Sequence, residues 1–211
     1  MPALTLNGFP SLKNLIFPSE AISKIGMKKV ITYFEKAGPE NTEETIRLAY
    51  ERALELGIKD VVVASTHGST ALKLAELFNP SKFNVVAVTI SEGYSEEGWT
   101  MTSDERSALQ KRGIKVLTCT HSLSDGVDEA FAGLLSVKEV IAQTLYRFSQ
   151  GMKVCVEIVL MAADAGLIPV DRSVIAIAGT DRGADTAIVV KPSYSRKFTE
   201  LKIKEIICMP S

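Results

Sequence analysis

A short turn rich in glycine and hydroxyl side chains holds the residues of this chain that are best suited to chemistry. It reads Ala64-Ser65-Thr66-His67-Gly68-Ser69-Thr70 and joins an apolar, β-branched segment at 58–63 to a segment of helical composition at 71–77. A strand that enters a helix through such a turn leaves several backbone N–H groups without partners, and the helix dipole adds positive charge there. The turn is therefore predicted to bind an anion, above all a phosphate. The alternative is a tight turn whose polar residues only cap the helix.

A second Gly-rich segment joins two apolar segments at 174–178 and 187–190. It reads Gly179-Thr180-Asp181-Arg182-Gly183-Ala184-Asp185-Thr186. It is too short to contain a helix, so the two apolar segments are predicted to be antiparallel neighbours in a sheet. Its hydroxyl and backbone N–H groups also suit a phosphate monoester, and Arg182 adds positive charge. As for the first turn, the alternative is a purely structural role.

The few histidines and cysteines raise other chemistries. His67, Cys119 and His121 would need Glu92 or a similar group to complete a metal site, and Cys119 with His121 would form a nucleophile pair. A Cys-x-His spacing is weak evidence for either chemistry, so we expect no metal ion. Glu157 lies in an apolar segment, where an ion pair or a hydrogen bond is expected rather than a functional carboxylate.

The elements that must position these residues alternate between strand and helix. Strands are predicted over 28–34, 58–64, 85–90, 114–119, 174–178 and 187–190, with an edge strand over 201–208. Helices are predicted over 42–56, 71–78, 102–112, 136–149 and 153–165, the last apolar on most of its surface and therefore central. This alternation predicts an α/β fold with three layers, α/β/α, and a mostly parallel sheet.

Capping residues set the expected limits of these helices. Asn41, Thr102 and Ser136 each precede a glutamate by three residues, which is the spacing of a capping box. Gly57 is expected to end the first helix, and Gly151 to separate the last two. Residues 27–211 are predicted to form one domain. Residues 1–26 are weakly patterned and are either an N-terminal extension or the result of a start codon placed too early.

Composition excludes several classes of partner. The 211 residues carry a net charge of −1, and the pI is near 6.2, so neither nucleic acid nor an anionic membrane is expected as a partner. Lys13 and Glu20 interrupt any signal peptide, and the longest apolar stretch, 154–167, is too short to cross a bilayer. Three widely spaced cysteines favour a reduced, cytoplasmic protein. The apolar faces of 136–165 and of the last strand favour a homo-oligomer.

Two segments resemble the C-terminal domain of pyruvate kinase. Residues 61–71 are similar to its strand–turn–helix unit, in which a Thr-x-Ser-Gly-x-Ser/Thr-Ala turn holds a phosphate of an allosteric sugar bisphosphate, although His67 departs from that pattern. Residues 175–190 resemble its last two strands. The fuller resemblance is to a stand-alone prokaryotic family of pyruvate kinase C-terminal-domain-like proteins, best represented in archaea, and it covers residues 27–211. Its blocks lie at 33–35, 40–42, 63–65, 150–157, 161–170 and 183–187.

This resemblance implies a five-stranded sheet of order 3-2-1-4-5, with the last strand antiparallel, and flavin mononucleotide (FMN) as the bound cofactor. In that order the Ser65–Thr70 turn and the Gly179–Thr186 loop face each other at the carboxyl ends of adjacent strands. Neighbouring loops would bring Tyr94 and Trp99, which either stack on a flat ring or pin a long loop to the sheet. The predicted cofactor-binding residues are Glu35, Asn41, Ser65, Thr66, His67, Gly68, Ser69, Thr70, Glu92, Gly93, His121, Gly179, Thr180, Gly183, Asp185 and Thr186.

The predicted function is therefore to bind FMN with its phosphate between the turn and the loop. If the protein is an enzyme, a flavin-dependent oxidoreductase is the expected class. The alternatives are a regulatory module that binds a phosphorylated metabolite without catalysis and a metal-dependent hydrolase built on His67, Cys119 and His121. Pyruvate kinase activity is not expected, because that chemistry resides in a separate barrel domain. No residue is identified as a catalytic acid or base.

Overall fold

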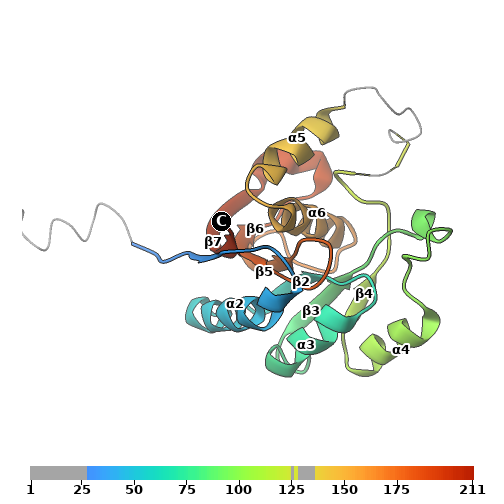
Figure 1. Cartoon of the computed structure of the whole chain (residues 1–211), viewed down its shortest axis with the longest axis horizontal. Helices are drawn as coiled ribbons and strands as arrows, with labels where there is room; N and C mark the ends of the chain where they lie inside the picture. Colours follow the sequence, from blue (N-terminus) through green and yellow to red (C-terminus); the bar gives the residue numbers. More distant parts are fainter. Residues whose placement is uncertain (1–27, 125, 128–135) are drawn as a thin grey trace, which may run out of the picture. The chain divides into compact units, whose positions relative to one another are not determined.

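A seven-stranded sheet organises the chain from residue 31 onward (Figure 1). The computed structural model describes residues 28–124, 126–127 and 136–211, so the predicted N-terminal extension, residues 1–26, lies outside the described residues. The strand order is β1-β7-β6-β5-β2-β3-β4. The strands are β1 (Thr32–Phe34), β2 (Asp60–Ala64), β3 (Asn84–Val88), β4 (Lys115–Leu117), β5 (Val174–Ala178), β6 (Thr186–Lys191) and β7 (Lys202–Pro210).

The predicted order is contained in this sheet as β4-β3-β2-β5-β6, and β6 is antiparallel to β5 as expected. The sheet has two strands more than the five that the resemblance implied, and both fall in segments predicted as strands, 28–34 and 201–208. Its antiparallel strand is not the last. β7 pairs antiparallel with β6, and β1 pairs parallel with β7, so that Thr32 lies opposite Cys208. The segment predicted as an edge strand is followed by β1 in the strand order, but β1 pairs only with residues 208–210. Among the described residues, no strand pairs with 202–207 on the side away from β6, so that part of β7 lies at the edge as predicted.

Helices cover both faces of the sheet, which confirms the three-layer architecture (Figure 1). On one face, α2 (Thr42–Leu56), α3 (Ser69–Leu77) and α4 (Ser103–Lys111) lie over the side chains of Val61 and Val63. On the other, α6 (Gln150–Asp164) covers the side chain of Val62, and α5 (Val137–Tyr146) packs on α6. Alternate residues of β2 thus enter different halves of the core, as the period of a strand requires.

Helix α2 has the predicted bounds, Thr42–Leu56, but the capping contact predicted for Asn41 and the boundary predicted at Gly151 are wrong. Asn41 does not cap α2 through its side chain; its amide nitrogen donates to the carbonyl oxygens of Lys36 and Gly38 within a 3₁₀ turn (Pro39–Asn41) that precedes the helix. Gly151 does not separate α5 from α6. The break lies at 147–149, where the Ser149 hydroxyl accepts the N–H of Met152 at 2.9 Å.

Gly151 has a different role, because it lies inside α6 where that helix crosses β6. A Cβ at this position would overlap the hydroxyl and Cβ of Thr186. The glycine is therefore required for close packing of helix on strand rather than for ending a helix.

The capping predictions for Thr102 and Gly57 are confirmed: Thr102 forms a capping box with Glu105, and Gly57 adopts φ 65° after α2.

Candidate functional site

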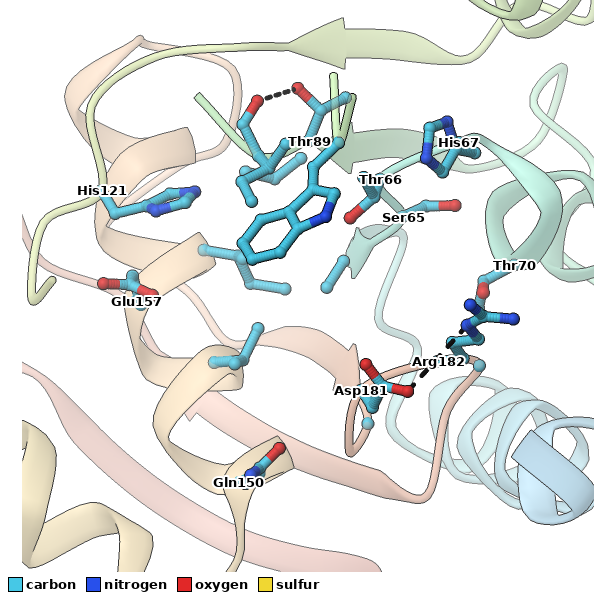
Figure 2. Close-up of a pocket in the computed structure, with 18 of the residues that line it drawn as sticks. Ser65, Thr66, His67, Thr70, Thr89, His121, Gln150, Glu157, Asp181 and Arg182 are labelled. Atoms are coloured by element: carbon cyan, nitrogen blue, oxygen red, sulfur yellow. Dashed lines mark hydrogen bonds and ion pairs between the residues drawn. The ribbon is translucent and has the colours of Figure 1, made fainter. Parts of the chain in front are cut away.

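A crevice of about 830 Å³ opens at the carboxyl ends of β2, β3 and β5 (Figure 2). Its walls come from the 64–70 turn, the end of β3, the segment around Trp99, one face of α6 and the loop at 179–183. The two Gly-rich segments that were expected to face each other therefore both line it. This is the usual position of a ligand site in an open α/β sheet, where chain connections leave neighbouring strands in opposite directions.

The 64–70 turn, most of whose residues line the crevice, has several backbone N–H groups that are not used in its own hydrogen bonds. The N–H of Ser65 completes the sheet by bonding the carbonyl of Val88 at 2.9 Å, and the Ser65 hydroxyl folds back to accept the N–H of Ala71 at 3.2 Å. Gly68 adopts φ 83° and passes so close to Leu109 that an added Cβ would lie 3.2 Å from that side chain. Among the described residues, no acceptor is hydrogen-bonded to the N–H groups of Thr66, His67, Gly68, Ser69 or Thr70.

The side chain of His67 contacts Glu105, a residue outside the turn. Its Nδ1 lies 3.3 Å from Glu105 Oε2, and the same oxygen accepts the N–H of Thr102 at 2.8 Å and its hydroxyl at 2.9 Å. The hydrogen bond from the Thr102 backbone lowers the pKa of Glu105, and the Thr102 hydroxyl and His67 lower it further. Glu105 therefore stays ionised and holds His67 at the rim of the crevice.

The opposing loop is organised by a buried carboxylate. Asp185 is fully buried; its Oδ2 accepts the N–H groups of Gly38 and Thr180, each at 3.1 Å, and its Oδ1 accepts the Thr186 hydroxyl at 2.8 Å. The Thr186 oxygen also lies 3.1 Å from the hydroxyl oxygen of Ser149. Thr180, Asp185 and Thr186 do not line the crevice, so their predicted contact with a ligand stays a prediction.

The close fit of this loop also depends on glycine. A Cβ on Gly179 would lie 2.7 Å from the carbonyl oxygen of Gly183, and a Cβ on Gly183, which adopts φ 70°, would lie 2.7 Å from Pro39 Cα. The loop bonds many of its own N–H groups, including those of Arg182 and Ala184. Its charged contribution to the crevice is the exposed guanidinium of Arg182, which is paired with the Asp181 carboxylate at 3.9 Å (Figure 2).

Flat rings line another wall of the crevice. Tyr94 stacks on Trp99, with ring centroids 5.9 Å apart and an interplanar angle of 19°. His121 stacks on Tyr94 at 6.4 Å and 25°. The rings that were expected either to bind a flat ligand or to pin their loop therefore contact each other, and Trp99 remains half exposed at the crevice.

A buried ion pair lines the crevice on α6. Lys153 Nζ lies 2.6 Å from Glu157 Oε2, and the two side chains are 4% and 5% exposed. Glu157 therefore has the ionic partner that was expected for it. Lys153 was not identified from the sequence, although its position four residues before Glu157 on a helix is the spacing of an ion pair.

The remaining predicted residues lie elsewhere. Glu35 and Asn41 do not line the crevice, and Glu92 and Gly93 line a separate pocket of about 600 Å³ beside Cys119. Their roles stay predictions. In the part of the chain that the structure describes, no three His, Cys, Asp or Glu side chains are grouped to hold a metal ion, so His67, Cys119 and His121 do not form a ligand set.

The chain is a three-layer α/β domain, and its crevice lies at the carboxyl edge of the sheet, where proteins with open α/β sheets bind their ligands. Residues 43–190 match the pyruvate kinase alpha/beta domain, and the chain belongs to that family. The resemblance of the sequence to the C-terminal domain of pyruvate kinase is thereby confirmed. No helix within the described ranges is long and apolar enough to cross a membrane.

Among solved structures, the chain is similar to pyruvate kinase from Cryptosporidium parvum. A complex of that enzyme with ADP is 17% identical, with a TM-score of 0.35, over 90% of this chain and 26% of the enzyme. A second structure of a pyruvate kinase from the same organism is 17% identical, with a TM-score of 0.35, over 81% of this chain and 25% of the enzyme. The chain spans about a quarter of the length of these enzymes.

Proposed function

We propose that this protein binds FMN in the crevice, with the phosphate on the 64–70 turn and Arg182 opposite. The observation that carries the proposal is the run of five N–H groups, from Thr66 to Thr70, that lack an acceptor at the start of the nine-residue helix α3. Such donors, aided by the helix dipole, favour a dianionic group. The charge of Arg182 in the same crevice adds to this preference.

The rest of the crevice suits the ring and ribityl parts of the cofactor. A volume of about 830 Å³ lies within the range of pockets that enclose small molecules. Trp99 offers a flat face, and Val154 and Ile158 offer apolar surface from α6. A polar phosphate end and a partly aromatic, partly apolar body match an amphipathic ligand of this kind.

The chain's own residues bind and orient in this proposal. The turn holds the phosphate, Asp185 keeps the opposing loop in place, and the aromatic wall orients the ring and limits its contact with water. When bound, a flavin supplies hydride or electron transfer, so we propose flavin-dependent oxidation–reduction as the class of reaction.

The test compares FMN with riboflavin, which lacks the phosphate. Flavin fluorescence is titrated with the purified protein, and the visible spectrum of the protein as purified shows whether cofactor is already present. We expect FMN to bind at least about 100-fold more tightly, because two charge-assisted hydrogen bonds of ~1.5 kcal/mol each give that ratio. Equal affinity for both flavins would exclude the phosphate cradle, and no binding of either would exclude the function.

A regulatory module is the second candidate, because the family includes the alpha/beta domain of a larger enzyme. Such a module would use the same five N–H groups for a phosphorylated metabolite and would catalyse nothing. Displacement of bound FMN by a sugar bisphosphate at micromolar concentration, without any flavin reduction by nicotinamide nucleotides, would favour this candidate over an oxidoreductase.

A further inference from the structure

One face of α6 turns polar where it meets the crevice. Gln150, Lys153, Val154, Glu157 and Ile158 all line the cavity, and their spacing of three and four residues places them on a single stripe of the helix. Elsewhere α6 is buried and mostly apolar. Two charged residues therefore occupy the most enclosed helix of the domain, at the surface that faces a ligand.

The two charges form a closed network with a serine. Glu157 Oε1 accepts the N–H of Leu123 at 2.9 Å and lies 2.9 Å from the hydroxyl oxygen of Ser124, while Oε2 accepts Lys153. The Lys153 ammonium also donates to the Ser124 hydroxyl, and it lies 5.8 Å from the centroid of the Tyr146 ring. These contacts hold the ammonium in one position at the edge of the crevice.

Stability does not account for this network. Burying an ion pair costs desolvation free energy that its own attraction barely offsets, and apolar replacements of similar volume are often neutral or stabilising. Val154 and Ile158 on the same stripe show that this wall accepts apolar side chains. A fixed cation in a site of low polarity is more useful for binding a group that carries or develops negative charge.

We propose that Lys153 is the electrostatic anchor for the ring end of the ligand, oriented by Glu157 and Ser124 as positioning residues. Figure 2 shows Glu157 and His121 on one side of the pocket and Thr70 and Arg182 on the other, so a ligand with its phosphate on the turn extends toward α6. The inference rests on the proposed function. It adds that the chemical group at this end is an electron-rich carbonyl edge, whose negative charge in the reduced ring the ammonium stabilises.

The midpoint potential of bound FMN tests this role independently of any activity. Dithionite supplies two electrons per flavin, and the solvent supplies a proton. The ratio of the affinities for reduced and oxidised FMN gives the shift in midpoint potential on binding, because the two are thermodynamically linked. In the double variant Lys153→Met with Glu157→Gln, which leaves no buried unpaired charge, we expect reduced FMN to lose at least about tenfold in affinity relative to oxidised FMN. That ratio corresponds to a potential about 30 mV lower.

Two further variants complete the design. Arg47→Met with Glu51→Gln removes an exposed ion pair of the same i, i+4 spacing on α2 and should leave the potential unchanged. Ser124→Asp adds a carboxylate at an exposed position that faces both the Lys153 ammonium and Glu157, so the negative charge beside the ammonium increases. It should lower the potential in the same direction, and it decides the matter if the double variant does not fold.

The outcomes separate the two proposals. A lowered potential in the folded double variant or in Ser124→Asp, with the Arg47 control unchanged, supports the anchor. FMN binding with an unchanged potential in these variants overturns the anchor and leaves the proposed function standing. Failure of the wild-type protein to bind FMN overturns both.

Discussion

Replacing Asp185 should separate the residue that holds the phosphate-facing loop from the groups that touch a ligand. In Asp185→Ala the N–H groups of Gly38 and Thr180 lose their acceptor, while the Thr186 hydroxyl keeps Ser149 as a neighbour. Two backbone donors left without acceptors cost about 1–3 kcal/mol each, so we expect the free energy of unfolding to fall by about 4 kcal/mol. Asp185→Asn retains an acceptor of the same shape and should cost about 1–2 kcal/mol.

Urea unfolding followed by tryptophan fluorescence and circular dichroism measures these differences. With a slope of about 2–3 kcal/mol/M, a loss of about 4 kcal/mol moves the midpoint by about 1.3–2 M for the alanine variant. Asp181→Asn is the matched control: Asp181 lies in the same loop at φ 60°, which asparagine tolerates, and its side chain is 87% exposed. We expect that control to stay within about 0.5 kcal/mol of the wild type.

The supporting role of Asp185 is contradicted if Asp185→Ala unfolds at the same urea concentration as Asp185→Asn or as the Asp181 control. It is also refuted if Asp185→Asn, while folded, loses all affinity for FMN. That result would make the carboxylate a ligand contact rather than a support behind the loop.

Three other outcomes are expected. His67→Ala should retain FMN affinity within about fivefold, because backbone N–H groups hold the phosphate and an exposed side-chain ion pair adds at most ~1 kcal/mol; loss of all binding in a fluorescence titration would contradict this. Gly183→Ala should lower the urea midpoint by the equivalent of about 2–4 kcal/mol, because φ is 70° and its Cβ would lie 2.7 Å from a backbone Cα atom; an unchanged midpoint would show that the loop can relax. At about pH 8 a thiol reagent should label Cys119 rapidly in the folded chain, and all three cysteines after unfolding. The reason is that burial raises the pKa of Cys155 well above its ordinary value and that of Cys208 to about 12. Rapid labelling of a second thiol before unfolding would contradict this.

The central strands could be predicted because their local composition indicates that they are buried. β2 and β5 are short β-branched or apolar runs that end at glycine- or hydroxyl-rich turns, and both occur as predicted. The pairing of β1 with residues 208–210 of β7 was missed, because β1 is a three-residue strand more than 150 positions away and a pairing at that distance leaves no local signal. The Gly151 error has a similar cause, since only the position of Thr186 on the neighbouring strand explains that glycine.

The candidate site was predictable to the level of its loops but not of its side chains. The turn at 64–70 and the loop at 179–183 both reach the crevice, because the fold class places them at the same edge of the sheet. Composition could not show that Asp185 points away from the crevice, nor that Lys153 reaches it. A helical lysine four residues before a glutamate is common on solvated surfaces, and its burial here depends on α5 and on the 122–124 segment.

The two halves of the crevice edge differ in a way that follows from how each is stabilised. A loop that offers N–H groups to an anion must obtain its own order from elsewhere. Ser65 provides this for the first turn by accepting the N–H of Ala71, which leaves five donors unbonded. The second loop is ordered by bonding its own N–H groups, so it has few to offer and contributes the charge of Arg182 instead. Truncating Arg182 to methionine should therefore weaken FMN binding by a factor that shrinks as salt rises, because an exposed charge is screened, whereas the contribution of the first turn should change little with salt.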